Sequence, residues 1–246
     1  MTLDLPQEVL IHRITNKIRQ SLELQEILTT TTAEIRAFLK TDRVIIYRFH
    51  PDESGEVIAE SMGEKPLPSL LGLNFPADDI PVTTKERIIK TRQRAIIHVD
   101  KKLTGISILE SLETGESIPK IEINYRPSDP CHLEYLMAMG VKFSLSVPIF
   151  AGEKLWGLLV AHHGENREIT TGELEFIQTV ADQVSLAIAQ ANILSLARSQ
   201  AHIEATINKI GTLLHDQPTI ELQKALEETV LVFQSCGGRI YILSTD

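Results

Sequence analysis

The sequence predicts an α+β fold, with a central antiparallel β-sheet flanked by helices. Apolar residues recur every three to four positions near the start of the chain and again from Thr170 onward, as they do in amphipathic helices. Between these segments lie short stretches rich in β-branched and aromatic residues, which are separated by turn-forming residues. Two of the stretches are joined by only Ala151–Lys154, which fits a tight antiparallel connection.

The first predicted element is a helix over residues 6–40. Apolar side chains recur four residues apart from Leu10 to Leu22, and the stripe then continues toward the end of the segment. The β-branched tract 29–32 is the weakest point of this helix, because such side chains lose rotamer freedom in a helical turn. We therefore expect any break in the helix near this tract.

Three strands, a loop and a helix are predicted next. The stretches RVIIYRF (43–49) and EVIAESM (56–62) have the composition and alternation of paired strands, and the residues between them favour a hairpin. Several prolines make 64–81 a loop. A short helix over 82–91 then leads into a strand over 94–100, RAIIHVD.

The long connection over 101–129 has weak periodicity. A connection of this length is unusual in a compact domain unless it carries function or hides a short helix, for which ISILESL (106–112) is the candidate. Two strands follow it, KFSLSVPIF (142–150) and LWGLLVAHH (155–163), and these flank the tight turn.

A long helix is predicted from Thr170, where Thr170 and Glu173 fit an N-terminal cap with an acidic first turn. Its apolar residues step by three and four, as in a heptad seam, at Leu174, Ile177, Val180, Val184, Ile188, Ala191 and Leu194. From Val184 onward we expect this seam to meet a partner helix. The helix runs on toward Leu214 and Pro218 stops it; a helix over 220–234 and a strand over 237–243 end the sequence.

Composition narrows the class of protein. A chain of 246 residues with 43% hydrophobic and 23% charged residues is typical of a soluble globular protein. Its net charge of −9 and lack of a basic stripe argue against nucleic-acid binding. The sequence shows neither an apolar run of membrane-spanning length nor a basic leader, so we expect a cytoplasmic protein with no membrane partner.

Cys131 and Cys236 form no disulfide framework, so each thiol needs its own explanation. A lone cysteine is most often a small buried apolar residue, and that reading suffices for Cys236. Cys131 has three further readings: a hydrolase nucleophile, a metal ligand with His132 and the 162–163 histidine pair, and a covalent anchor. Cys131 and His132 begin a short segment that is predicted to be helical, and a helix start favours a thiolate and suits the anchor.

Several motifs occur in order between Asp42 and His163: DRVIIYRF, GEVIAES, NFPADDIP (74–81), CHLEYL (131–136), SLSVPI and LWGLLVAHH. Together they resemble the chromophore-binding GAF domain of phytochromes and cyanobacteriochromes. The resemblance implies a GAF fold and a phycocyanobilin or related linear tetrapyrrole (bilin), held through a thioether at Cys131. It implies neither a metal site nor a catalytic residue, so the chain is expected not to be an enzyme.

The resemblance also assigns roles to other residues. His132 corresponds to the histidine beside the pyrrole rings, Asp79 to the aspartate whose backbone carbonyl faces the pyrrole N–H groups, and His162 to the histidine that binds the D-ring carbonyl. Aromatic packing around the D ring is implied for Tyr47, Phe75 and Tyr135. Propionate binding is implied for Arg94, Arg126, Ser144 and Ser146.

The sequence departs from the family pattern in places. Asp78 stands where the family often has serine, the second reactive cysteine of some cyanobacteriochromes is missing from the matched region, and no PAS-like segment precedes it. The arrangement resembles knotless phytochromes. We expect a helical segment over 1–40, a bilin-binding GAF domain over 41–200, a helical linker over 201–218, and over 219–246 the incomplete start of a second GAF- or PHY-like unit.

The function implied is a photoreceptor module that switches by 15Z/15E isomerisation, with red and far-red absorption. A homodimer through the helix over 173–200 and a downstream histidine kinase or other output module are the expected protein partners. Two alternatives stay open: a GAF domain that senses a cyclic nucleotide or another small ligand, and a cysteine-dependent enzyme.

Overall fold

The structure is a computed structural model. It describes residues 7–20, 23–64, 67–111, 116–118, 121–216, 221–233 and 235–241. These residues fall into two compact units, one that ends at Ala191 and one that begins at Asn192.

The first unit contains an eight-stranded sheet, in which every pair of neighbouring strands is antiparallel. The strand order is β3-β2-β1-β8-β7-β4-β5-β6. The strands are β1 (Arg43–Phe49), β2 (Gly55–Met62), β3 (Asn74–Phe75), β4 (Arg94–His98), β5 (Leu103–Ser107), β6 (Asn124–Pro127), β7 (Phe143–Ala151) and β8 (Lys154–His163). The predicted α+β fold with an antiparallel sheet is confirmed.

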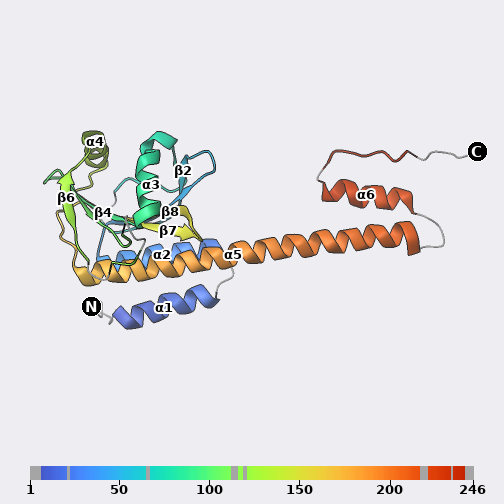
Figure 1. Cartoon of the computed structure of the whole chain (residues 1–246), viewed down its shortest axis with the longest axis horizontal. Coiled ribbons are helices and arrows are strands. Elements are labelled where there is room, and N and C mark those ends of the chain that lie inside the picture. The colour runs from blue at the N-terminus through green and yellow to red at the C-terminus, as the bar shows by residue number, and fades with distance from the viewer. Residues whose placement is uncertain are drawn as a thin grey trace, which may run out of the picture. The chain divides into compact units, whose positions relative to one another are not determined.

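Helices cover both faces of the sheet (Figure 1). They are α1 (Gln7–Gln20), α2 (Leu24–Leu39), α3 (Val82–Thr91), α4 (Pro130–Ala138) and α5 (Thr171–Gly211), with a short 3-10 turn, η1, at Ala77–Asp79. One core cluster joins α2 and the start of α5 to one face. A second cluster, which includes Ile88 of α3 and Leu133 of α4, lies on the other face. Neighbouring residues such as Val44 and Ile45 enter different clusters, because side chains alternate along a strand.

The N-terminal helix breaks earlier than expected. α1 ends at Gln20 and α2 begins at Leu24, while the threonine tract lies inside α2. There the hydroxyl of Thr29 donates to the carbonyl of Gln25 at 2.9 Å, and that of Thr32 donates to the carbonyl of Thr29 at 2.8 Å. The helix tolerates these residues because their hydroxyls bond to its own backbone.

The connection over 101–129 holds two strands, and the short helix expected at 106–112 is wrong for the described part of that segment. Ile106 and Ser107 end β5, and the main chain at Glu110 bridges to Ser117. β5 contains Thr104 and Gly105 and lacks a clear alternation of apolar residues, so pairing with β4 stabilises it more than its own composition does.

The start of α5 agrees with the predicted cap. The hydroxyl of Thr170 accepts from the backbone N–H of Glu173 at 3.2 Å, and the Glu173 carboxylate accepts from the backbone N–H of Thr170 at 2.8 Å. This reciprocal pair is a capping box. The helix continues to Gly211, as its periodicity predicted, and a π-helical turn follows over Thr212–Asp216.

The seam of α5 packs differently from the expectation. Val184 and Ile188 are both 0% exposed and belong to the core cluster under the first unit's own sheet. They therefore cannot meet a partner helix without unpacking the domain, and the prediction for this part of the seam is wrong. The cause is that α5 crosses the sheet along the same side chains that carry the heptad spacing.

The second unit begins within α5 and contains α6 (Leu222–Val232). Thr206 and Ala225 are buried in it, and Lys209 pairs with Glu228 at 2.5 Å. The strand predicted over 237–243 is not present over Gly237–Tyr241, the part that the structure describes. A strand needs a hydrogen-bonded neighbour, and no described residue pairs with this segment. Pro218, the predicted helix stop, lies outside the described residues.

One helix among the described residues, Thr171–Leu214, is long and apolar enough to cross a membrane by length and composition alone. Its early turns carry Leu174, Ile177 and Val180, which are buried against the sheet. A core helix passes the same test, so the expectation of no membrane span stays a prediction.

Candidate functional site

Strand register places a defined row of side chains on the sheet face that lies away from α5. Directly opposed residues of antiparallel strands project to the same face. Successive partners across the sheet are Arg126, Thr104, Ile97, Ser144, His162 and Arg43. Ile97 packs in the cluster of α3 and α4, which identifies the face. Tyr47, four residues beyond Arg43 on β1, lies on the same face.

Four rings from three elements form a continuous wall beside this row. The centroid of Tyr47 lies 5.9 Å from that of Phe75, Phe75 lies 6.4 Å from Tyr135, and Tyr135 lies 6.2 Å from His132. β1 supplies Tyr47, β3 supplies Phe75, and α4 supplies the other two. Such a wall suits a flat, conjugated ligand, because aromatic faces and edges pack well at these separations.

Asp79, at the end of η1, places a carboxylate among these rings. Burial raises the pKa of the Tyr47 hydroxyl to about 12, and the charge of Asp79 contributes to that rise. Burial and then Asp79 likewise raise the pKa of Tyr135. Since electrostatic effects on a pKa fall off with distance, Asp79, Tyr47, Tyr135 and His132 share one site.

His132, in the first turns of α4, lies beside these rings. Its side chain is exposed to solvent, yet desolvation by the surrounding protein lowers its pKa, and the charges of Asp129 and Asp79 oppose that shift. Ring contacts thus bring the predicted site residues His132, Tyr47, Phe75 and Tyr135 together, and the charge of Asp79 acts on three of them.

His162 lies on the same sheet face, between Ser144 and Arg43, and is hydrogen-bonded to this buried arginine. The Nη2 and Nε atoms of Arg43 lie 2.8 and 3.2 Å from the Nδ1 atom of His162. Burial, together with the charges of Arg43 and His132, lowers the pKa of His162 to about 3. The imidazole is therefore neutral at physiological pH.

Cys131 lies in the first turn of α4, as expected for a residue at a helix start. Asp129 caps the helix by accepting from the backbone N–H of His132 at 3.1 Å, and Pro130 occupies the first helical position. The thiol is free and exposed. Among the described residues, no hydrogen bond joins Cys131 to a histidine.

Arg94 does not reach this site, so the propionate contact expected for it is corrected. Its Nη2 atom donates to the hydroxyl of Ser107 at 2.8 Å and its Nη1 atom to the carbonyl of Leu174 in α5 at 3.4 Å. Burial lowers its pKa to about 10, opposed by Glu175 and Asp182 of α5. The reason is strand parity: Arg94 and Ile96 face α5, whereas Ile97 faces the site.

The other three residues predicted to bind propionates lie on the sheet face that carries His162. Arg126 lies exposed on the edge strand β6 and shares the row of His162. Ser144 is buried and pairs directly with His162. Ser146 is half-buried and lies two residues further along β7, again on this face. Their roles stay predictions.

Arg43 is the site residue that the sequence reasoning missed. It is 0% exposed, although an arginine is seldom buried this completely. The sequence does indicate which face of β1 it occupies, because side chains alternate along a strand and Arg43 therefore lies on the same face as Ile45 and Tyr47. Sequence inspection gave no reason to expect its partner, because β8 lies more than a hundred residues away in the chain.

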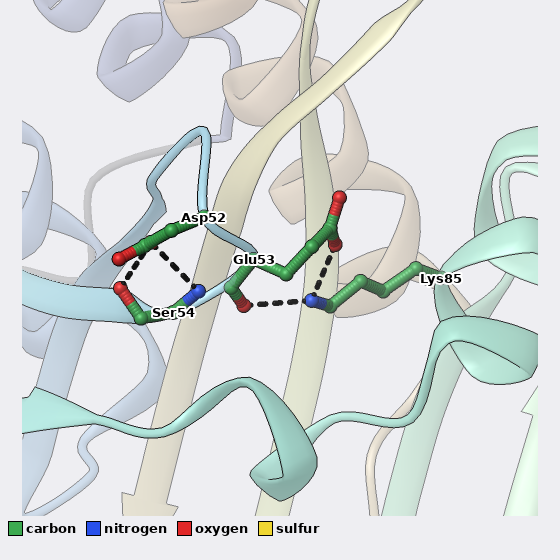
Figure 2. A network of polar contacts seen from close by, with 4 residues as sticks. All are labelled: Asp52, Glu53, Ser54 and Lys85. Atoms are coloured by element: carbon green, nitrogen blue, oxygen red, sulfur yellow. Dashed lines mark hydrogen bonds and ion pairs between the residues drawn. The ribbon is translucent and has the colours of Figure 1, made fainter.

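A second polar network joins the β1–β2 hairpin to α3 (Figure 2). The Nζ atom of Lys85 donates to the carbonyl of Glu53 at 2.8 Å and to its carboxylate at 2.7 Å. At the hairpin tip Asp52 accepts from the backbone N–H and the hydroxyl of Ser54 at 3.1 and 2.6 Å. These contacts join the first turns of α3 to the hairpin, and the loop that carries Asp79 leads directly into this helix.

The fold and the site define the class of protein. The antiparallel sheet with helices on both faces is consistent with one domain family in particular, because the GAF domain family model matches residues 23–188, more than half of the chain. The chain belongs to the GAF domain family. The match begins before β1 and so includes α2.

Relatives and solved structures confirm the resemblance to phytochrome-type GAF domains. The phycoerythrobilin-bound GAF domain from a cyanobacterial phytochrome is 55% identical with a TM-score of 0.73, and the match covers 79% of this chain and 100% of that one. A phycocyanobilin-bound GAF domain from a cyanobacterial phytochrome is 54% identical, with a TM-score of 0.70 over 77% of this chain and 97% of that one.

Longer relatives match the same region. The bacteriophytochrome of Pseudomonas aeruginosa is 39% identical over 153 residues, 61% of this chain and 21% of the relative. The circadian input-output histidine kinase CikA of Thermosynechococcus vestitus is 30% identical over 212 residues, 82% of this chain and 26% of the relative. The chain thus spans about a fifth to a quarter of the length of these curated relatives.

Proposed function

We propose that this chain is the photosensory module of a phytochrome-like photoreceptor and that it binds a linear tetrapyrrole, phycocyanobilin or a close relative. One observation carries the proposal: the exposed thiol of Cys131 is adjacent in α4 to His132, which belongs to a row of four contacting rings on the sheet face that also carries the neutral His162. Likeness over the full length of a bilin-bound GAF domain supports the same ligand.

Each residue has a role that follows from its position. The Cys131 thiol adds across a carbon–carbon double bond of a bilin side group, so that a C–S bond forms, the thiol proton goes to carbon and nothing leaves. Tyr47, Phe75 and Tyr135 pack against the ring that rotates. His162 donates to that ring's carbonyl, and the backbone carbonyl of Asp79 accepts from the pyrrole N–H groups. Arg126, Ser144 and Ser146 bind the propionates, because they lie on the sheet face that carries His162, whereas Arg94 faces α5.

Light absorption then drives 15Z/15E isomerisation, with red absorption in the dark and far-red absorption after illumination. Asp79, His132 and His162 support this colour assignment, together with the absence of a second cysteine from the described part of the site; Cys236 belongs to the other unit. The chain itself acts as a sensor without a catalytic step.

The exposed thiol allows a direct test of attachment. Protein produced in a host that makes phycocyanobilin should be coloured, and denaturing electrophoresis with zinc-induced fluorescence should show the pigment on the polypeptide. Cys131→Ala should lose that fluorescence, whereas Cys236→Ala, at another exposed free cysteine, should retain it. Fluorescence that survives Cys131→Ala and vanishes in Cys236→Ala would refute the assignment. A spectrum before and after red light tests the colour.

For the partner, we infer a homodimer through a different face of α5 from the predicted seam. In the second unit Ile193, Leu196, Ile203 and Ile207 are 67%, 71%, 44% and 61% exposed and recur at steps of three, seven and four. This spacing matches the core of a coiled coil, so a second copy of the same helix is the occupant that fits. Sedimentation of Ile193→Asp at micromolar protein tests the dimer, and a sedimentation coefficient equal to that of the wild type would exclude this face of α5.

A histidine-kinase-type output is proposed on the likeness to longer relatives, one of which is a histidine kinase.

The match to the GAF domain family also allows a second candidate, a GAF domain that senses a colourless small ligand such as a cyclic nucleotide. It would leave the purified protein colourless in a host that makes bilin, and it would give the exposed thiol no role. A cysteine-dependent enzyme fits less well, because Arg43 occupies the Nδ1 lone pair of His162 that a general base would use.

A further inference from the structure

A buried contact that the proposed function does not use joins Arg43 to His162. Two guanidinium nitrogens, Nη2 and Nε, lie 2.8 and 3.2 Å from the same imidazole atom, Nδ1. Both side chains are buried, at 0% and 5% exposure, so water does not compete for the bond. The contact joins β1 to β8 at directly paired positions.

Chemistry assigns the proton in this contact. A guanidinium has five N–H donors and no acceptor, and it stays charged in proteins. The Nδ1 atom of His162 must therefore offer its lone pair. A neutral imidazole carries one proton, so that proton is on Nε2, the nitrogen on the far side of the ring. Among the described residues, no hydrogen-bond acceptor for Nε2 is present.

The arginine is held from other directions as well. Its Nη1 atom donates to the carbonyl of Pro68, and its Nη2 atom also contacts the sulfur of Met139 at 3.6 Å. Within the described residues no carboxylate lies within ion-pair distance of Arg43, although Glu60 acts on its pKa from further away. The guanidinium plane is thus set by acceptors on the loop before β3 and at the end of α4, and the orientation of the imidazole follows from it.

We propose that Arg43 is a positioning residue that fixes His162 as a neutral imidazole protonated on Nε2, so that His162 presents one hydrogen-bond donor and no acceptor to the ligand space. The meaning of this donor for a bilin rests on the proposed function, but the tautomer is a property of the protein alone. A ligand group that meets Nε2 must therefore be an acceptor, such as a carbonyl oxygen. A pyrrole N–H at that place would be rejected, because two donors would face each other.

The experiment measures the tautomer directly in the protein without bilin. Protein labelled with ¹⁵N-histidine is studied by NMR through the couplings between imidazole nitrogens and ring protons, and His162→Gln identifies the signals. We expect a protonated nitrogen at Nε2 and an unprotonated one at Nδ1. Arg43→Lys retains a donor and should retain this pattern. Arg43→Met removes the donor, so a population protonated on Nδ1 should appear.

Arg48→Met is the matched control, since Arg48 lies on the same strand, is exposed and stacks on Trp156. It should leave the His162 signals unchanged. Wild-type protein with Nδ1 protonated would overturn the proposal, and so would a folded Arg43→Met protein with the wild-type pattern. If Arg43→Met does not fold, the wild-type and Arg43→Lys spectra still decide. Loss of the proposed function would instead appear as colourless protein, with the tautomer unaffected.

Discussion

Replacing Ile188 by alanine tests which apolar side chains of α5 pack in the domain's own core and which are exposed. Ile188 is 0% exposed and packs in the cluster that joins α5 to the sheet, whereas Ile193, five residues later, is 67% exposed. Replacing a fully buried isoleucine by alanine removes its burial and leaves a cavity, which costs roughly 2–5 kcal/mol of unfolding free energy. The same change at an exposed site falls within about 0.5 kcal/mol.

For a domain of this size, each kcal/mol lowers the melting temperature by roughly 2–4 °C. Ile188→Ala should therefore melt roughly 4–20 °C below the wild type, by circular dichroism at a concentration where both are monomeric. Ile193→Ala should melt within about 2 °C of the wild type under the same conditions. Equal melting temperatures for the two variants would refute the assignment of Ile188 to the domain's own core.

Three further predictions concern the site. Burial lowers the pKa of His162 to about 3 in the folded state, so the unfolded chain binds more protons than the folded chain between about pH 3 and 6.5. The free energy of unfolding should therefore fall on acidification through that window. Urea titrations of His162→Gln should show a shallower fall than those of the wild type. Arg94→Met should lower stability and leave the bilin spectrum and affinity unchanged, whereas Arg126→Met should weaken bilin binding; a spectral change confined to the Arg94 variant would contradict the assignment of faces. Asp129→Ala removes the N-cap of α4 and should cost about 1 kcal/mol in denaturant unfolding, with slower attachment at Cys131. Asp129→Asn keeps a side-chain oxygen that can accept from the backbone N–H of His132 and is the control, so an equal loss in both variants would exclude a capping role.

The paired strands of the domain could be predicted from local signals. β1, β2, β7 and β8 are rich in β-branched residues and are separated by recognisable turns, so their bounds were predicted within one or two residues. α3 was predicted without error, and α5 was recognised along its length. β3, which lies in the predicted loop over 64–81, and β5 and β6 were missed, because short strands near a sheet edge depend on their partners more than on their own composition.

The candidate site was predicted unevenly for a similar reason. The motif around Cys131 and His132, the loop with Asp79 and the rings of Tyr47, Phe75 and Tyr135 were identified from the order of motifs along the chain. The structure gathers them because β1, β3, η1 and α4 converge on one face of the sheet. The spacing of the motifs alone contains no information on which face that is.

What the sequence determined by itself is the local periodicity: the helices, the strong strands, the capped start of α5 and the order of the motifs. The tertiary structure decided which of two alternating sets of side chains faces the ligand and which faces α5. That choice removed Arg94 from the site, brought Arg43 to His162 and buried Ile188 in the core. The physical reason is that alternation defines two faces of a strand, but only packing against other elements decides what each face contacts.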